Sequence, residues 1–266
     1  MKIKQDMHIH THLSSCSRDP EQNPKAIIEW AAQNGLDTIC FTDHFWDETI
    51  PGASDWYKPQ DLQHIEAIRE QIPLSTLGVK VLVGCETEFI GGKTVGISRA
   101  VADKMDFINL PFDHFHMKDF VCPHTIKTVE QVAELWLIRF DEVLELDLPW
   151  HKIALAHCND ILGFKPQMKA IFEILLNDNK RELQRLFIRC ATQGTKIEIN
   201  TSVCSSPVWQ DLFSYHKAFF SIAKDSGCLF TFGSDAHHPK ALNNILPASS
   251  VAKRLGLEKH HIYQPL

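Results

Sequence analysis

The sequence predicts an α/β protein built as a distorted, TIM-like (β/α)7 barrel. Short apolar or β-branched runs alternate with helical stretches along the chain, which is typical of a parallel sheet covered by helices. The length of 266 residues fits a closed or nearly closed barrel forming one domain over residues 1–266. A doubly wound open sheet is the alternative, but no Gly-x-Gly-x-x-Gly follows a strand, so the dinucleotide-binding form lacks its motif.

In the first half of the chain, each expected element has a recognisable start or stop. Asn23 is typical of a helix N-cap, Pro24 of a first helical position, and Gly35 of a stop, while Pro73 ends the next helix. In this half we expect strands at residues 4–9, 38–42, 79–83 and 106–110, and helices at residues 24–34, 59–72 and 98–105.

The second half continues the alternation. Pro149 closes a long amphipathic helix, and Gly194 and Gly227 end two later helices. Here we expect helices at residues 129–146, 166–176, 179–193, 207–226 and 240–255, and strands at residues 152–156, 196–200 and 228–232.

The composition disfavours several classes of protein. With 27 Lys and Arg against 33 Asp and Glu, the formal net charge of −6 argues against broad nucleic-acid binding. No apolar run approaches the roughly 18 residues of a membrane-spanning helix, and the N-terminus lacks the apolar segment of a secretory signal. We therefore expect a cytoplasmic protein that binds neither membrane nor nucleic acid.

Histidine and cysteine usage narrows the possible metal ligands. The 8 cysteines include no Cys-x-x-Cys pair, which disfavours a zinc ribbon or a thioredoxin-type centre, and we expect them to be reduced and buried. The 15 histidines are numerous beside 3 tyrosines. If the protein binds a metal, histidines and carboxylates should hold it.

Metal-capable side chains stand at the C-terminal end of every expected strand. In a parallel barrel these ends surround one mouth, where barrel active sites lie. So many buried imidazoles and carboxylates would be costly without a cation, and they exceed the coordination shell of one ion. The residues predict two or three Zn, Mn or Fe ions. They are Asp6, His8 and His10; Asp43 and His44; Glu86; His114; His157; Glu198 and Asn200; and Asp235 and His237.

Five pieces of this pattern resemble the PHP (polymerase and histidinol phosphatase) family. They are Asp6-Met-His8-Ile-His10-Thr11, Thr42-Asp43-His44, Gly84-Cys-Glu86, the isolated His114 and His157, and Gly233-Ser-Asp235-Ala-His237. The resemblance runs in the family's order from residue 6 to residue 237. It implies a distorted seven-stranded barrel, a trinuclear site and hydrolysis of phosphate esters.

The resemblance also implies a ligand set. One ion would be held by His8, His10, Glu86 and Asp235, with Glu86 bridging, and a second by Glu86, His114 and His157. A third would be held by His44 and His237 with one ligand from the loop after His10, where the family often has His or Asp. In that loop we expect Asp19 to be the ligand, with Cys16 as the alternative. Asp6 and Asp43 are expected to orient ligand histidines.

The expected reaction is hydrolysis of a small phosphomonoester by a hydroxide that bridges the metals. Glu86 and Asp235 are the expected catalytic residues, and histidinol phosphate is one candidate substrate. The alternatives are a C–N or C–O hydrolase of the amidohydrolase-like barrel class and a non-catalytic metal-binding sensor. The lack of a lysine at a strand end counts against the first, and the full ligand set counts against the second.

Other residues near the motifs have less specific expectations. Arg18, Lys118 and Lys165 are expected to be solvated loop cations, any of which could contact a substrate phosphate. Three aromatic residues, Phe45, Trp46 and Trp56, fit either the core or a pocket wall. His12, His116 and His238 are expected to line the pocket or lie at the surface. We expect surface positions for His124, His151, His216, His260 and His261.

Overall fold

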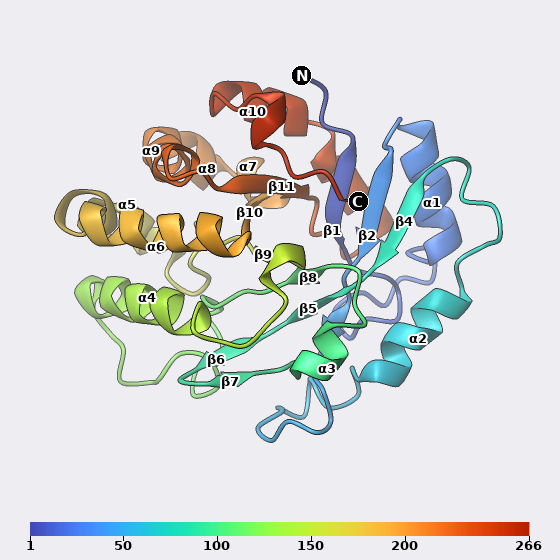
Figure 1. Ribbon diagram of the computed structural model, residues 1–266, viewed down its shortest axis with the longest axis horizontal. Helices are drawn as coiled ribbons and strands as arrows, with labels where there is room; N and C mark the ends of the chain where they lie inside the picture. Colours follow the sequence, from blue (N-terminus) through green and yellow to red (C-terminus); the bar gives the residue numbers. More distant parts are fainter. Residues whose placement is uncertain (266) are drawn as a thin grey trace.

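Parallel strands form the centre of the structure, a computed structural model that describes residues 1–265 (Figure 1). One sheet has three strands in the order β1 (Gln5–Ile9), β2 (Thr38–Phe41), β4 (Lys80–Val83). The other has six strands, and each of its neighbouring pairs is parallel. Its order is β11 (Leu229–Gly233), β10 (Lys196–Asn200), β9 (Ile153–Leu155), β8 (Ile108–Asn109), β5 (Cys85–Thr87), β3 (His44–Phe45).

Two of the expected strands, at residues 38–42 and 79–83, are each followed closely by a second short strand that was not predicted. The chain continues from β2 into β3 across Thr42 and Asp43, and from β4 into β5 across Gly84. A side chain at Gly84 would overlap the main chain of Phe107, so only glycine allows the chain to pass here. This break separates the two sheets and gives the barrel its distortion.

The first and last strands meet beside each other. The Asp235 amide donates to the His8 carbonyl oxygen at 2.8 Å, and the His10 amide donates to the Ala236 carbonyl oxygen at 3.0 Å. Across the interior, the Asn109 side chain donates to the Met7 carbonyl oxygen at 2.9 Å. The seven predicted strand positions are therefore present and arranged around a common interior, with an irregular contact between β11 and β1.

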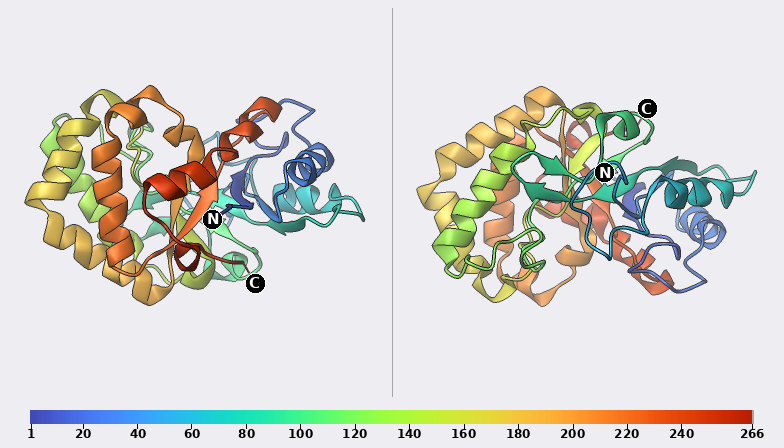
Figure 2. Two further views of the ribbon diagram at one scale, coloured as in Figure 1. Left: turned by 90° about the horizontal axis from the view of Figure 1, so that it is seen from above. Right: turned by 90° about the horizontal axis from the view of Figure 1, so that it is seen from below.

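Helices cover the strands from outside. Helices α4, α6 and α9 lie on one side of the strands, and α1 and α2 lie on the opposite side (Figures 1 and 2). The start of α1 follows the sequence signal, because the Asn23 side chain accepts a hydrogen bond from the Ala26 amide. The α-helices are α1 (Pro24–Gln33), α2 (Leu62–Glu70), α3 (Arg99–Ala102), α4 (Val129–Val143), α5 (Met168–Glu173), α6 (Lys180–Gln193), α7 (Thr201–Cys204), α8 (Pro207–Asp211), α9 (Phe213–Asp225) and α10 (Ala248–Arg254).

Several elements differ from the sequence prediction. The helix expected at residues 207–226 is two helices, α8 and α9, and the helix expected at residues 240–255 is a 3-10 segment followed by α10, with Pro247 between them. A π-helical turn (Ile174–Asp178) joins α5 to α6. Further 3-10 turns lie at Trp150–Lys152, Lys165–Gln167, Pro239–Ile245 and Lys259–His261.

A small antiparallel hairpin was not predicted. It pairs β6 (Phe89–Gly91) with β7 (Thr94–Val95). Its turn contains Gly91 and Gly92, both with positive φ, at 106° and 61°. A Gly-Gly pair between two short β-prone runs is a hairpin signal, so the sequence did contain the information.

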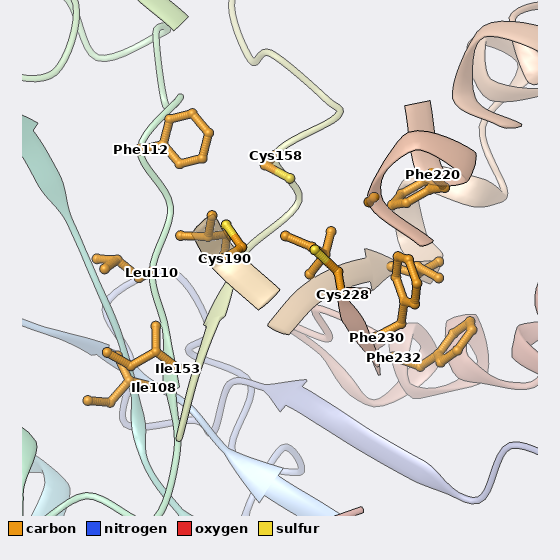
Figure 3. Packing of buried hydrophobic residues seen from close by; sticks show 14 of the residues in the cluster. Ile108, Leu110, Phe112, Ile153, Cys158, Cys190, Phe220, Cys228, Phe230 and Phe232 are labelled. Atoms are coloured by element: carbon orange, nitrogen blue, oxygen red, sulfur yellow. The ribbon is translucent and has the colours of Figure 1, made fainter. Parts of the chain in front are cut away.

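The cysteines pack as apolar residues, as predicted for all but one of them. Figure 3 shows Cys158, Cys190 and Cys228 among apolar side chains such as Ile153 and Phe230. Seven of the eight cysteines are buried, all eight are free thiols, and Cys16 is exposed. Among the described residues, no helix is both long and apolar enough to cross a membrane.

Candidate metal centre

The predicted ligands converge because parallel strands deliver their last residues to the same end of the barrel. The structure brings eight of the nine predicted ligands into three groups whose potential ligand atoms lie within 4.8 Å of one another. The groups are His8, His10 and Asp235; Glu86, His114 and His157; and His10, Cys16, His44 and His237. Asp19 belongs to none of them.

Glu86 lies between the groups, on β5. Its Oε2 atom is 3.3 Å from the Nε2 atoms of both His8 and His10. Its Oε1 atom faces the other way, 3.2 Å from His157 Nε2 and 4.0 Å from His114 Nε2. The two oxygens of one buried carboxylate thus face two different ligand groups, which is the arrangement that a bridging ligand requires.

Asp235 completes the first group. Its Oδ1 atom lies 3.3 Å from His10 Nε2 and 3.6 Å from His8 Nε2. Its Oδ2 atom accepts a hydrogen bond from the Asn200 side chain at 3.0 Å. Asp235 is therefore fixed by β10 while its other oxygen points at the histidines.

Two further glutamates orient the histidines. Glu198 accepts a hydrogen bond from His8 Nδ1 at 2.7 Å with one oxygen and from the His157 amide at 2.7 Å with the other. Glu88 accepts a hydrogen bond from His114 Nδ1 at 2.7 Å. Because a carboxylate accepts from Nδ1, the Nε2 lone pair of His8 and of His114 is left to face the ligand groups.

Glu88 is a site residue that no sequence motif indicated, and Glu198 was predicted only as a polar residue at a strand end. Glu198 lies two residues before Asn200 on β10, so strand alternation places both on one face. Glu88 lies two residues after Glu86, just beyond the end of β5, so the same spacing in an extended chain could have indicated it. Both glutamates are fully buried, and buried carboxylates require such partners.

Asp6 and Asp43 position the main chain and do not belong to a ligand group. Asp6 accepts from the Ser234 amide at 2.8 Å, and Asp43 accepts from the Thr11 hydroxyl at 2.7 Å. Asp43 also contacts His64 Nε2 at 3.0 Å. His64 lies on α2, outside every sequence motif, and was therefore not predicted to be near the site.

The loop after His10 places Cys16, and not Asp19, at the third group. Asp19 is exposed, and its side chain accepts a hydrogen bond from the Glu21 amide, which fixes it in a surface turn. Partial desolvation alone would raise the pKa of the Cys16 thiol, but the charge of His10 and hydrogen bonds with neighbouring histidines lower it to about 3. The structure thus places Cys16, and not Asp19, among the candidate ligands of the third group.

Opposite charges stabilise one another inside the site. Burial alone would raise the pKa of Glu86, but the charges of His44 and His8 hold it well below its usual range. Burial alone would lower the pKa of His8, but Glu198, Asp235 and Glu86 raise it to about 10. In the absence of a metal ion, these carboxylates favour protonation of the imidazoles, and the imidazoles favour ionisation of the carboxylates.

This donor set fits divalent metal ions. The Nε2 atoms of His8 and His10 lie 3.2 Å apart, and those of His114 and His157 lie 3.3 Å apart. Imidazole nitrogens that face one another in a buried site need a shared cation or proton between them. Since a metal ion binds deprotonated ligands, it can replace the protons that these histidines hold.

Two site residues have unusual backbone conformations. His157 has a φ of 32° and Asp235 a φ of 52°, and such left-handed values are uncommon for residues other than glycine. Each stands just after the end of its strand, where the turn redirects the side chain into the mouth. Residues held this way cluster at functional sites.

A cavity of about 300 Å³ opens over the ligand groups. Besides the candidate ligands, its wall includes Trp56, Tyr57, Met117 and Leu162. His116 is exposed and also lines this cavity. Of the aromatic residues considered from the sequence, Trp56 forms part of the wall, whereas Phe45 and Trp46 are buried in the core.

A smaller side pocket of about 170 Å³ shares His157 and Asp235 with this cavity, and Lys165 lies at its edge, 3.0 Å from Asp160. Lys118 lines neither pocket, and its Nζ atom lies 4.4 Å from the centre of the Phe164 ring. Arg18 is exposed and lines neither of these two pockets.

The surface assignment of His216 is wrong. The residue is buried on α9, where its ring stacks on Trp209 and its Nδ1 accepts a hydrogen bond from Asn159 at 3.0 Å. The spacing of apolar residues along α9 places His216 on the buried face beside Phe219 and Phe220. His124, His151, His238 and His260 are exposed, as predicted, and His12 and His261 are half-buried.

Comparison with known proteins agrees with this geometry. The sequence matches the PHP domain over residues 6–255. The chain belongs to the PHP domain family. The family match covers all three ligand groups, so the resemblance predicted from the five motifs is confirmed.

Individual relatives are distant but align along most of their length. The chain is 25% identical over 264 residues to a probable phosphatase of Vibrio campbellii, covering 98% of this chain and 88% of that protein. It is 23% identical over 270 residues to a histidinol-phosphatase of Lactococcus lactis, covering 96% and 93%.

Among solved structures, the chain is similar to a histidinol phosphate phosphatase of Lactococcus lactis, crystallised with zinc, L-histidinol and phosphate. The TM-score is 0.62 at 19% identity, and the match covers 96% of this chain and 94% of that one. This likeness confirms the predicted fold class.

Proposed function

We propose that the chain is a metal-dependent phosphoesterase that hydrolyses a small phosphomonoester. The observation that carries the proposal is the position of Glu86, whose two oxygens face two separate ligand groups. Membership of the PHP domain family and the phosphatase names of its relatives support the reaction type.

The ligand groups suggest up to three ions. His8, His10, Glu86 and Asp235 would hold the first, and Glu86, His114 and His157 the second. The third group would supply His44 and His237. Nitrogen and carboxylate ligands suit Zn, Mn or Fe, and the zinc of the Lactococcus structure supports the first of these.

When bound, such ions activate a water molecule and stabilise the charge that develops on phosphoryl oxygens. The chain's own residues fix the geometry in which this happens. Glu198 and Glu88 hold the Nδ1 protons of His8 and His114, which keeps both rings in the tautomer that presents Nε2 to the ligand group.

Asp235 is the carboxylate best placed to move a proton. Its side chain is 21% exposed, whereas that of Glu86 is 2% exposed. Both line the cavity, but only Asp235 also lines the side pocket. Its Oδ2 atom, held by Asn200, can accept a proton from the attacking water or pass one to the leaving oxygen.

The cavity favours a small substrate with an apolar part. Its volume of about 300 Å³ is at the low end for ligand sites. Trp56 and Met117 offer apolar contact to the leaving group, and Lys165 at the side pocket offers a cation to phosphate oxygens. Histidinol phosphate is one candidate, supported by the names of two relatives.

The test is a substrate panel with metal analysis. The zinc- or manganese-loaded protein should hydrolyse phosphomonoesters, among them histidinol phosphate, but not amides or carboxylic esters. His157→Ala should lose metal and phosphatase activity together, because His157 belongs to the group that Glu86 shares. His124→Ala is the matched control, since His124 is exposed and pairs with Asp119 at the surface.

The alternatives give different results in the same panel. Turnover of amides without phosphomonoesters would identify a hydrolase of the amidohydrolase-like class. Binding of a phosphomonoester without any turnover by the loaded protein would identify a sensor. Less than one metal ion per chain after loading would contradict the metal centre itself.

A further inference from the structure

Cys16 differs from the other cysteines of the chain. Seven of the eight are buried, while Cys16 is exposed and lines the cavity over the ligand groups. Its sulfur belongs to the group whose ligand atoms lie within 4.8 Å of one another, with His10, His44 and His237. It is the one cysteine among the described residues that takes part in such a group.

The loop that carries Cys16 is fixed on both sides. The buried Gln60 side chain accepts hydrogen bonds from the Ser14 hydroxyl at 3.2 Å and from the Ser15 amide at 3.0 Å. On the other side, the Ser17 hydroxyl donates to the His237 carbonyl oxygen at 2.7 Å. These contacts tie the loop to the segment that carries His237, so the position of the sulfur is defined by the fold.

The histidines around Cys16 have nitrogen atoms that are free to bind a metal ion. His237 Nδ1 is 2.8 Å from the Asp235 carbonyl oxygen, and since a carbonyl only accepts, Nδ1 carries the proton and Nε2 keeps its lone pair. His44 Nδ1 is buried and has no hydrogen-bond partner, although it points at Glu86 Oε2 from 3.2 Å. The ring of His10 stacks on that of His237 at 4.2 Å, but its Nε2 already faces Glu86 and Asp235.

We propose that Cys16, His44 and His237 are the ligands of the third ion, and that the thiolate makes this one position selective for zinc over manganese. The inference rests on the metal centre of the proposed function but not on its phosphatase activity. Thiolate and imidazole are preferred by zinc, whereas manganese prefers carboxylate and water. The other two positions, with imidazole and carboxylate only, have no such bias toward thiophilic metals.

Cobalt provides a direct test, because a thiolate bound to Co²⁺ gives a charge-transfer absorption in the near ultraviolet that imidazole and carboxylate do not. The full chain is stripped of metal with a chelator and titrated with Co²⁺ while the spectrum and the bound metal are measured. The wild type should develop the band as one of its cobalt ions binds.

Two variants at position 16 and one control separate the possibilities. Cys16→Ser should lose the band and bind the third ion more than about tenfold more weakly. Cys16→Asp should lose the band but keep the third ion, with its zinc-over-manganese preference reduced more than about tenfold. Asp19→Asn is the matched control in the same loop and should keep both the band and the preference.

The outcomes distinguish this inference from the proposed function. Bound cobalt without a band in the wild type, or a band that persists in Cys16→Asp, would overturn the role of Cys16 and leave the phosphatase proposal standing. Loss of the third ion in Asp19→Asn would return that role to Asp19. No cobalt binding at all would overturn both proposals. Circular dichroism and binding of the first two ions show that each variant is folded.

Discussion

Replacement of Glu198 by glutamine tests how the metal centre is oriented. Glu198 is fully buried, and both of its oxygens accept hydrogen bonds at 2.7 Å, one from His8 Nδ1 and one from the His157 amide. Glutamine has nearly the same shape but offers one acceptor and one NH₂ donor. It therefore cannot satisfy both donors at once.

Either orientation of the substituted side chain in Glu198→Gln has a definite cost. If its oxygen faces the His157 amide, its NH₂ faces His8 Nδ1, and the ring proton must move to Nε2, which then cannot bind a metal. If the side-chain amide is turned round, the buried His157 N–H loses its acceptor, at a cost of about 1–3 kcal/mol. We expect zinc affinity at the first position to fall by about 10–100-fold, or roughly 1.4–2.8 kcal/mol.

The assay is zinc competition with a chromophoric chelator on the purified full chain. Glu182→Gln is the matched control, because Glu182 lies on the outside of α6 in an ion pair with Arg185. Its zinc affinity should equal that of the wild type. If Glu198→Gln binds zinc within about twofold of the wild type at every position, the tautomer argument is wrong.

Two further predictions concern stability. Gly233→Ala should reduce the free energy of unfolding by about 1–3 kcal/mol and weaken zinc binding, because a Cβ atom at this position would overlap His8 and Glu198. Gly78→Ala is the control and should leave zinc binding unchanged, because no atom lies near its Cβ position. Burial lowers the pKa of His216 to about 3, so the unfolded chain takes up a proton below pH 6.5 that the folded chain refuses. The contribution of His216 to the free energy of unfolding is therefore fully present above pH 6.5. It decreases by about 1.4 kcal/mol per pH unit as the pH falls below this value. The free energy of unfolding of the metal-free proteins is measured in urea at several pH values, and His216→Phe should remove this pH dependence. The same pH dependence in the wild type and the variant would contradict the lowered pKa of His216.

The sequence predicts the candidate ligands at the strand ends better than those in the long loop after His10. Asp235, His8 and Glu86 follow from strand alternation and from the common edge that parallel strands share. Cys16 and Asp19 lie in an irregular loop, where the choice depends on Gln60 and on the carbonyl of His237, which are distant in sequence. No local pattern contains that information.

Breaks within elements were also hard to predict. The strand expected at residues 79–83 corresponds to β4, but the short strand β5 beyond Gly84 was missed, because the break at Gly84 depends on the close approach of Phe107. Likewise, His216 is assigned to the surface by residue type alone, while the packing of α9 places it beneath Trp209.

The junction between β1 and β11 has a consequence for how the protein acquires its metals. Asp6 and Ser234, which are hydrogen-bonded there, are 228 residues apart in the chain. Each of two ligand groups joins a residue from the first strand region to one that follows the last strand. A growing polypeptide on the ribosome therefore lacks these two binding positions until the segment with Asp235 and His237 has been made, and contacts of such long range form late and slowly. Complete metal binding at these two groups therefore requires that the β1 and β11 regions have already come together.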